Sequence, residues 1–251
     1  MPDVIADEIT RMDEAFAGNQ LLATFPREAR ALIEPHGTIV ELRSDEVALS
    51  AGDQVLSTLF PMGPTMISMA VELSGGRTVE VALIGLRGAV GGIVSCGQAP
   101  AFARAKVLTG GPALKVPMKA LEEAKQASPF IGNLFCRFSD YLLSQVMQSV
   151  ACNSFHPIPE RASRWLLHAQ DRTGDRIELT QQALANLLGV QRTTVNAVIQ
   201  SLEQKGFIIP GRGVIRVIDR AGLMRSSCEC YQRLEDHFDA VIGTTGTGNP
   251  G

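Results

Sequence analysis

Histidine is scarce in this 251-residue sequence, and the segment from Ile39 to Val116 contains none. An enzyme that holds a metal on a jelly roll needs clustered histidine and carboxylate ligands on its strands. A haem sensor likewise needs an axial ligand such as histidine. A jelly-roll metalloenzyme is therefore the least favoured alternative, and the sequence predicts no catalytic residue and no haem. The four histidines are His36, His156, His168 and His237.

Cysteine is also sparse, with five residues in an odd and scattered set. An odd number fits a reducing compartment better than a framework of disulfides. An iron–sulfur regulator needs four suitably placed cysteines, usually near the N-terminus, and the first one here is Cys96. Cys228-Glu229-Cys230 has the wrong spacing for a Cys-x-x-Cys redox or zinc pair. We therefore expect no metal site and no cofactor; burial as small hydrophobes is the simpler role for these cysteines, with a redox response left open.

Long hydrophobic runs are missing too. No apolar run approaches the length that spans a bilayer, and the acidic start MPDVIADEIT does not resemble a signal peptide. Hydrophobic residues make up 45% of the chain and charged residues 20%, which is typical of a soluble globular protein, and 251 residues can hold two domains of ordinary size. These features predict a cytoplasmic bacterial protein with no membrane partner.

Charge is distributed unevenly along the chain. The net charge of -3 argues against binding nucleic acid with the whole surface. Residues 154–224, however, contain nine Lys/Arg and six Asp/Glu, a local net charge of +3. A basic segment attached to an acidic body fits a DNA-binding module with a separate sensing or assembly domain.

The stretch from Leu179 to Phe207 predicts two short helices joined by a tight turn. Thr180 is a good N-cap for the first helix, because its hydroxyl can accept from an unpaired backbone N–H. Gly189 falls where that helix has to end, in a conformation that other residues adopt only at a cost. The expected inner faces at helical spacing are Ala183, Leu184, Leu187 and Leu188 in the first helix and Val195, Val198, Ile199 and Leu202 in the second.

The outer face of the second helix is small and polar in its first turns. Side chains of this kind at a helix N-terminus can hydrogen-bond base edges or phosphates in the DNA major groove. A helical hairpin inside a larger domain is the structural alternative. Two short strands are expected at 207–209 and 214–218, and Arg212 near the turn between them could reach phosphates as part of a wing. The polar set is Gln191, Arg192, Thr193, Thr194 and Asn196.

The run LTQQALANLLGVQRTTVNAVIQSLEQKGFI, followed by GRGVIRVIDRAGL, resembles the C-terminal domain of the Crp/Fnr superfamily of bacterial transcription regulators. The resemblance implies that Thr180 and Gln182 anchor the first helix to phosphates and that Arg192 reads guanine. Thr193 stands where many relatives have glutamate, so a different binding site is expected. The resemblance also implies a homodimer that binds an inverted repeat in double-stranded DNA, with RNA polymerase as a further candidate partner.

Residues 39–116 predict short strands punctuated by glycine and proline, which suggests a barrel or jelly roll. The clearest signal is an antiparallel hairpin between Met66 and Ile84, whose apolar and polar residues alternate on both sides of a Gly-Gly turn. The resemblance implies an eight-stranded β-roll like that of cyclic-nucleotide-binding domains. The predicted fold class is α+β: an N-terminal antiparallel β-roll, a long dimerisation helix and a winged helix-turn-helix domain.

Nucleotide-binding relatives use a Gly-Glu pair and a downstream arginine to hold the ribose and the cyclic phosphate. The matching pair here is Gly88 and Ala89, and the arginine position falls at about Ala101. Without these charged groups the chain is not expected to bind cyclic AMP in the usual way, which leaves an unknown small-molecule effector open. Arg104 would restore a cation only in a shifted register, and surface solvation is the simpler role for it. The glycine-rich turn around Gly91 could cradle a phosphate, although a structural role is commoner.

Ser128-Pro129 is a strong helix start, and the helix is expected to reach about Cys152 before a hinge over residues 153–157. Its apolar stripe is too wide for one sheet contact, so one side could pack on the β-roll and the other against a second copy. The resemblance makes this the dimerisation helix. The predicted dimer residues are Phe135, Phe138, Leu142, Val146 and Val150.

The predicted organisation has five parts. They are an N-terminal extension (1–18) with a frayed or accessory helix, a β-roll sensor domain (19–127), the dimerisation helix and hinge (128–153), the winged helix-turn-helix domain (154–240) and a disordered tail (241–251). The predicted function is a sequence-specific transcription regulator. A protein-binding co-regulator with a vestigial DNA domain is the main alternative.

Overall fold

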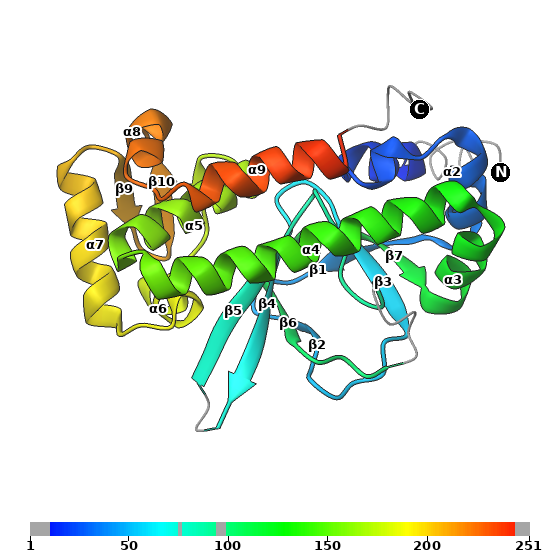
Figure 1. Ribbon diagram of the computed structural model, residues 1–251, viewed down its shortest axis with the longest axis horizontal. Coiled ribbons are helices and arrows are strands. Elements are labelled where there is room, and N and C mark those ends of the chain that lie inside the picture. The colour runs from blue at the N-terminus through cyan, green and yellow to red at the C-terminus, as the bar shows by residue number, and fades with distance from the viewer. Residues whose placement is uncertain (1–10, 75–76, 94–98, 244–251) are drawn as a thin grey trace.

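The computed structural model describes residues 11–74, 77–93 and 99–243. Predictions for residues 1–10, for the turn glycines at 75–76, for Cys96 and for the tail from residue 244 lie outside the described residues. Within them, a β-roll, a long helix and a smaller helical domain follow one another along the chain (Figure 1). The expected α+β class, with an antiparallel β-roll before a winged helix-turn-helix fold, is confirmed.

The β-roll consists of two antiparallel sheets. The resemblance implies eight strands, whereas the described residues of the roll form seven, with an isolated bridge between Leu59 and Val90 in addition. The first sheet has the order β1-β7-β3, with β1 Thr38–Leu42, β3 Ser57–Pro61 and β7 Gly111–Pro117. The second has the order β2-β6-β4-β5, with β2 Val47–Leu49, β4 Met66–Leu73, β5 Arg77–Ile84 and β6 Arg104–Thr109.

Strands β4 and β5 form the predicted hairpin, with Val71 opposite Val79. One face of the hairpin carries polar residues, yet Ser68 on that face is only 2% exposed. Glu80 beside it accepts a hydrogen bond from the Trp165 indole at 2.8 Å. Burial raises the pKa of Glu80 to about 7, so this carboxyl titrates near neutral pH. The polar face is covered because the C-terminal domain packs on it.

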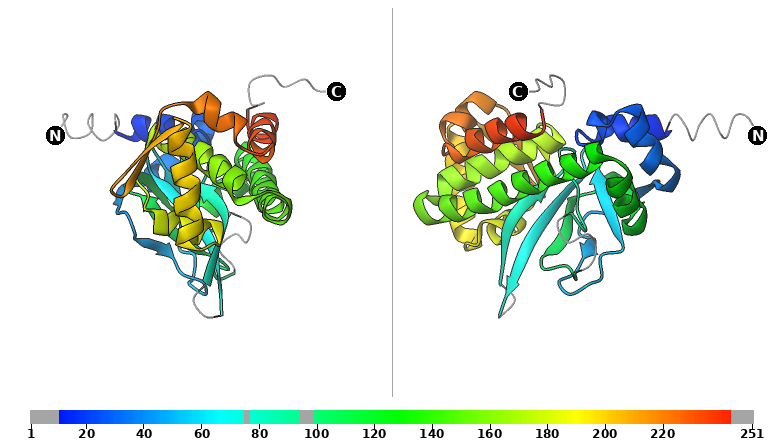
Figure 2. Two further views of the ribbon diagram at one scale, coloured as in Figure 1. Left: turned by 90° about the vertical axis from the view of Figure 1, so that its left-hand side faces the viewer. Right: turned by 45° about the vertical axis from the view of Figure 1, so that its right-hand side comes forward.

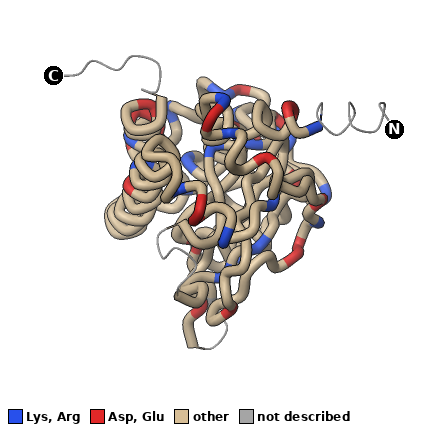
Figure 3. Tube along the Cα trace, turned by 90° about the vertical axis from the view of Figure 1, so that its right-hand side faces the viewer, with Lys and Arg blue, Asp and Glu red and all other residues tan. Residues whose placement is uncertain are grey.

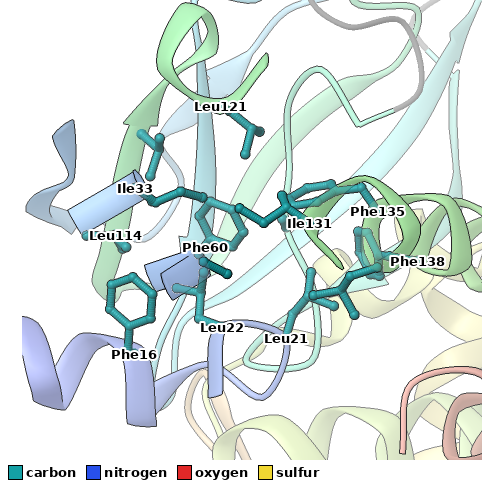
Figure 4. Packing of buried hydrophobic residues seen from close by; sticks show 14 of the residues in the cluster. Phe16, Leu21, Leu22, Ile33, Phe60, Leu114, Leu121, Ile131, Phe135 and Phe138 are labelled. Atoms are coloured by element: carbon teal, nitrogen blue, oxygen red, sulfur yellow. The ribbon is translucent and has the colours of Figure 1, made fainter. Parts of the chain in front are cut away.

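The N-terminal residues add helices to one end of the roll. Residues 11–18 are helical, and Met12 and Phe16 are buried in the main hydrophobic core. The described part of the extension is therefore a packed accessory helix, which is one of the two forms expected for it. Figure 4 shows Phe16 and Leu22 in the same cluster as Phe60 of β3. The next elements are η1 Leu22–Thr24, α2 Arg27–Ile33 and η2 Glu34–His36, and α3 Met118–Ala127 follows the roll.

The long helix α4 spans Pro129–Phe155 and begins where the sequence predicts, with the Ser128 hydroxyl accepting from the Ile131 N–H. Phe135 and Phe138 are 2% and 0% exposed within the core of the roll. The prediction that these two residues form a dimer face is therefore wrong, because their side chains already pack inside their own chain. The helix also continues three residues beyond the expected Cys152.

The C-terminal domain starts with α5 Ile158–Thr173 and surrounds a small sheet of order β8-β10-β9. The two predicted strands are present as β9 Ile208–Gly211 and β10 Val214–Val217, whereas the short strand β8 Arg176–Ile177 was not predicted. Beyond the wing, where the sequence predicts a short helix between Arg220 and Ala240, the structure has two helices. The remaining elements are α6 Gln181–Leu188, α7 Arg192–Gln204, α8 Arg220–Arg225 and α9 Cys230–Val241.

The C-terminal domain packs directly on the rest of the chain. Arg172 of α5 donates a hydrogen bond to the Leu83 carbonyl at 3.1 Å. Helix α9 runs back beside α4 (Figure 1), where the rings of Tyr141 and Phe238 meet edge to face at 5.0 Å. An ion pair joins Arg87 to Glu235 of α9. These contacts fix where the helix-turn-helix lies and leave α7 at one end of the molecule.

Candidate nucleic-acid interface

Helix α6, the first helix of the motif, begins and ends as the sequence predicts. The Thr180 hydroxyl accepts a hydrogen bond from the Ala183 N–H at 3.1 Å, which caps the helix. Gly189 ends it with φ 69° and ψ 34°, in the left-handed region that glycine tolerates best. Leu184 and Leu188 are buried in the core of the domain. Local chemistry therefore sets the position of the turn that leads into α7.

Helix α7 presents its polar side to solvent. Its apolar side, including Val195 and Ile199, is buried in the domain core. Its first turn contains no acidic residue, so the positive end of the helix dipole is left open to an anion. Figure 2 (left) shows α7, in yellow, with no other described element in front of it. The exposed polar residues are Gln191, Arg192, Thr193, Thr194 and Asn196.

The wing lies beside the start of α6. Strands β9 and β10 pair antiparallel, with Val214 opposite Gly211. Arg212 is exposed in the turn between them. A Cβ at the adjacent Gly213 would lie 4.0 Å from Thr180, so the wing turn and the α6 N-cap are neighbours. Gln182 is exposed next to this pair. The structure thus brings Thr180, Gln182 and Arg212 to one edge of the motif.

Within residues 11–74, 77–93 and 99–243, neither Arg192 nor Arg212 forms a salt bridge. At the end of the molecule opposite α7, residues of both signs are interspersed (Figure 3). This end therefore presents no surface of a single sign to a polyanion.

The β-roll and α4 form a partly open pocket of about 460 Å³ at the site where the resemblance implies an effector. Ala89, Gly91 and Ala101 line it, as predicted, together with Leu142 and Val146 of α4. Every described residue that lines the pocket is apolar or glycine. A cyclic phosphate would find no cation among the described lining residues, and an apolar molecule would match these walls.

Two predicted pocket residues lie elsewhere. Arg104 forms an ion pair with Glu72 at 2.7 Å and lines a different cleft, between the sheet and α6. Gly88 does not line the pocket; a Cβ there would lie 2.7 Å from the Phe138 ring, so glycine is required for packing. Both assignments to the effector pocket are therefore wrong.

Sequence reasoning missed two groups of residues. Leu143 and Met147 on α4 are 55% and 58% exposed, beside the predicted Val146 and Val150. Leu143, Val146, Met147 and Val150 follow the helical spacing i, i+3, i+4 and i+7, and this pattern in the sequence could have identified Leu143 and Met147. The structure also brings Cys152 close to His156 and to the Cys228–Cys230 pair, and no local spacing indicated that cluster.

Residues 160–226 match the family model described as the Crp-like helix-turn-helix domain. The chain carries a Crp-like helix-turn-helix domain. The matched span contains α6, α7 and the wing, so the resemblance first seen in the sequence is confirmed where the candidate interface lies. The HTH-type transcriptional regulator Cmr of Mycobacterium tuberculosis is 28% identical over 133 residues, which are 50% of this chain and 51% of that protein. The chain thus matches about half the length of this curated relative.

Solved structures show the same fold over most of the chain. FixK2 from Bradyrhizobium japonicum has a TM-score of 0.64 at 16% identity, with coverage of 76% of this chain and 98% of that one. TTHA1359 of Thermus thermophilus, a transcriptional regulator of the CRP/FNR family, has a TM-score of 0.60 at 18% identity, with 78% and 98% covered. None of these three relatives is named as an enzyme. The β-roll, α4 and the Crp-like domain of this chain therefore have the same fold as these structures.

No described helix is both long and apolar enough to cross a bilayer.

Proposed function

We propose that this chain is a sequence-specific transcription regulator that binds an inverted-repeat operator as a homodimer in the bacterial cytoplasm. The observation that carries the proposal is the exposed polar start of α7, held outward by a buried apolar side, together with exposed Arg212 of the wing beside the α6 N-cap. Arg192 would read a base edge, and Thr180, Gln182 and Arg212 would contact phosphates. RNA polymerase is a further partner that such a regulator would contact at a promoter.

The dimer contact is best supported on α4. Leu143, Val146, Met147 and Val150 follow one another at helical spacing, and all four are exposed. Four large apolar residues on one helical stripe would be covered if two copies pair through α4. Leu142 and Val146 also line the β-roll pocket, so an occupant of the pocket would touch the helix that carries this stripe. This contact offers a route from effector binding to dimer geometry.

We infer that the effector is a small apolar molecule and that cyclic AMP is not bound in the usual way. Cyclic AMP is expected to leave the melting temperature of the full chain unchanged, because the pocket walls provide no charged partner. If a fraction of apolar metabolites raises the melting temperature of the unaltered chain, Ala101→Phe should abolish that rise, because the phenylalanine ring fills the pocket from one wall. Thermal unfolding measures both results. A stabilising response to cyclic AMP that Ala101→Phe removes would contradict the inference.

DNA binding itself is tested by its dependence on salt. The full chain should select an inverted repeat from a random library, with an affinity that falls steeply as salt increases. Replacing Arg212 with alanine should weaken binding equally on all sequences and reduce the slope of log affinity against log salt by about 2, because each of the two wings of the dimer loses one phosphate contact. Lys119→Ala on α3, far from the motif, is the charge-matched control. A chain that selects no repeat would favour the alternative of a co-regulator with a vestigial DNA domain.

A further inference from the structure

Three cysteines and one histidine from distant parts of the chain converge where α4 ends. Cys152 and His156 are four residues apart at the end of α4, so they lie on the same side of it. Cys228 and Cys230 lie between α8 and the first residue of α9. One donor atom from each of the four residues lies within 4.8 Å of all the others.

The distances match the edges of a tetrahedral metal site. The Sγ atoms of Cys152 and Cys228 are 3.6 Å apart, and Cys230 Sγ lies 3.4 Å from His156 Nδ1. With Zn–S bonds of about 2.3 Å and Zn–N bonds of about 2.0 Å, neighbouring ligand atoms in a tetrahedron are roughly 3.5–3.8 Å apart. Burial of cysteines as small hydrophobes gives no reason for an imidazole nitrogen to join them at this distance.

We propose that Cys152, His156, Cys228 and Cys230 bind one Zn²⁺ ion per chain. Three thiolates and an imidazole are a donor set that zinc takes in structural sites, and hard ions such as Mg²⁺ and Ca²⁺ prefer oxygen. All four positions of the tetrahedron are filled by protein, so the site is structural and leaves no open position for a substrate. On binding, the three thiols release their protons to solvent and the imidazole binds in its neutral form.

The groups around the cluster complete the site. His156 directs Nδ1 at the sulfurs while its Nε2 lies 3.2 Å from a carboxylate oxygen of Glu229. A carboxylate that accepts from the second nitrogen fixes the tautomer and orientation of a ligating histidine. The Gln148 amide donates to Cys230 Sγ at 2.9 Å, which suits a thiolate. The His156 side chain is 19% exposed, so the ion can reach the buried sulfurs from this side.

The position of the cluster gives the metal a role in the architecture. The chain leaves α4 at His156 and enters α5 at Ile158, so the site lies at the junction between the long helix and the Crp-like domain. Glu229 has φ −57° and ψ −16°, a helical conformation that lets the cysteines on both sides of it reach the same ion. A bound Zn²⁺ would hold the end of α4 to the start of α9 and fix the orientation of the DNA-binding domain relative to α4.

The test uses the full chain, purified under reductant and freed of metal with a chelator. The metal-free chain is then titrated with Co²⁺, because Co²⁺ absorbs visible light strongly in tetrahedral thiolate sites. One Co²⁺ per chain is expected, displaced by one Zn²⁺. Cys228→Ser should abolish the spectrum, and Glu229→Ala, an exposed substitution, should weaken Co²⁺ binding about 10- to 100-fold. Cys136→Ser, which removes an exposed cysteine outside the cluster, should have no effect.

Zinc removal should lower the melting temperature of the unaltered chain and of Cys136→Ser, and leave that of Cys228→Ser unchanged. Circular dichroism establishes that each variant is folded. A reduced, folded chain that binds no stoichiometric Co²⁺, or binds it equally with Cys228→Ser, would overturn the proposal. A second result would also overturn the proposal: a Cys152–Cys228 disulfide in the purified chain and no metal binding after this disulfide is reduced. That result would assign the cluster to redox chemistry.

Discussion

Replacing Arg192 with alanine is expected to reduce the preference for operator over unrelated DNA by roughly 5- to 150-fold per half-site, because a bidentate arginine–guanine contact supplies about 1–3 kcal/mol of discrimination. Arg192 is the first residue of α7, and its side chain is exposed. No ion pair within the described part of the chain competes for its guanidinium. Binding to unrelated DNA should change little by comparison. A mobility shift with specific and unrelated competitors measures the ratio.

Arg43→Ala provides the matched control for this experiment. Arg43 is an exposed arginine that directly follows β1. Strand β1 lies well away from α7 (Figure 1), and the replacement makes the same change in net charge. If both variants lose affinity to the same extent, the effect is general electrostatics. If Arg192→Ala keeps the full preference for operator over unrelated DNA, Arg192 does not recognise a base.

The interface was predictable from sequence because its geometry is set locally. The Thr180 cap and the Gly189 turn each act within a few residues, so their positions fix where α6 and α7 begin and end. The apolar and polar sides of α7 then follow from helical periodicity. The same holds for the hairpin of β4 and β5, whose alternation and turn residues lie next to one another in the chain.

The errors concern side chains whose partners are distant in sequence. The stripe on α4 indicates that two sides are covered, but it does not say which side meets the roll. Phe138 faces inward because Gly88 leaves room for its ring, a contact between residues fifty positions apart. Arg104 faces away from the pocket because Glu72 pairs with it. The cysteine cluster likewise exists only after α9 has packed beside α4.

Two aspartates on α4, Met147→Asp with Val150→Asp, are expected to turn a dimer into a monomer. Both side chains are largely exposed, at 58% and 63%, so the substitutions should cost the fold of one chain little. In a dimer the same positions would bring four carboxylates into a desolvated contact, where like charges repel and each loses its hydration. Sedimentation or light scattering measures the mass in solution.

Operator binding should fall with the loss of the dimer. A monomer holds one half-site alone, and the gain from linking two binding units is of order 10²–10⁴, so the affinity for the full inverted repeat should drop by about that factor. Binding to an isolated half-site should be unchanged, because α7 is untouched. Leu56→Asp, at a 73% exposed position on a loop of the roll, is the control for added charge on an exposed apolar residue. If the double variant stays dimeric, the contact between copies lies outside the Leu143–Val150 stripe. The proposal that the Crp-like domain binds DNA would not be affected by that result.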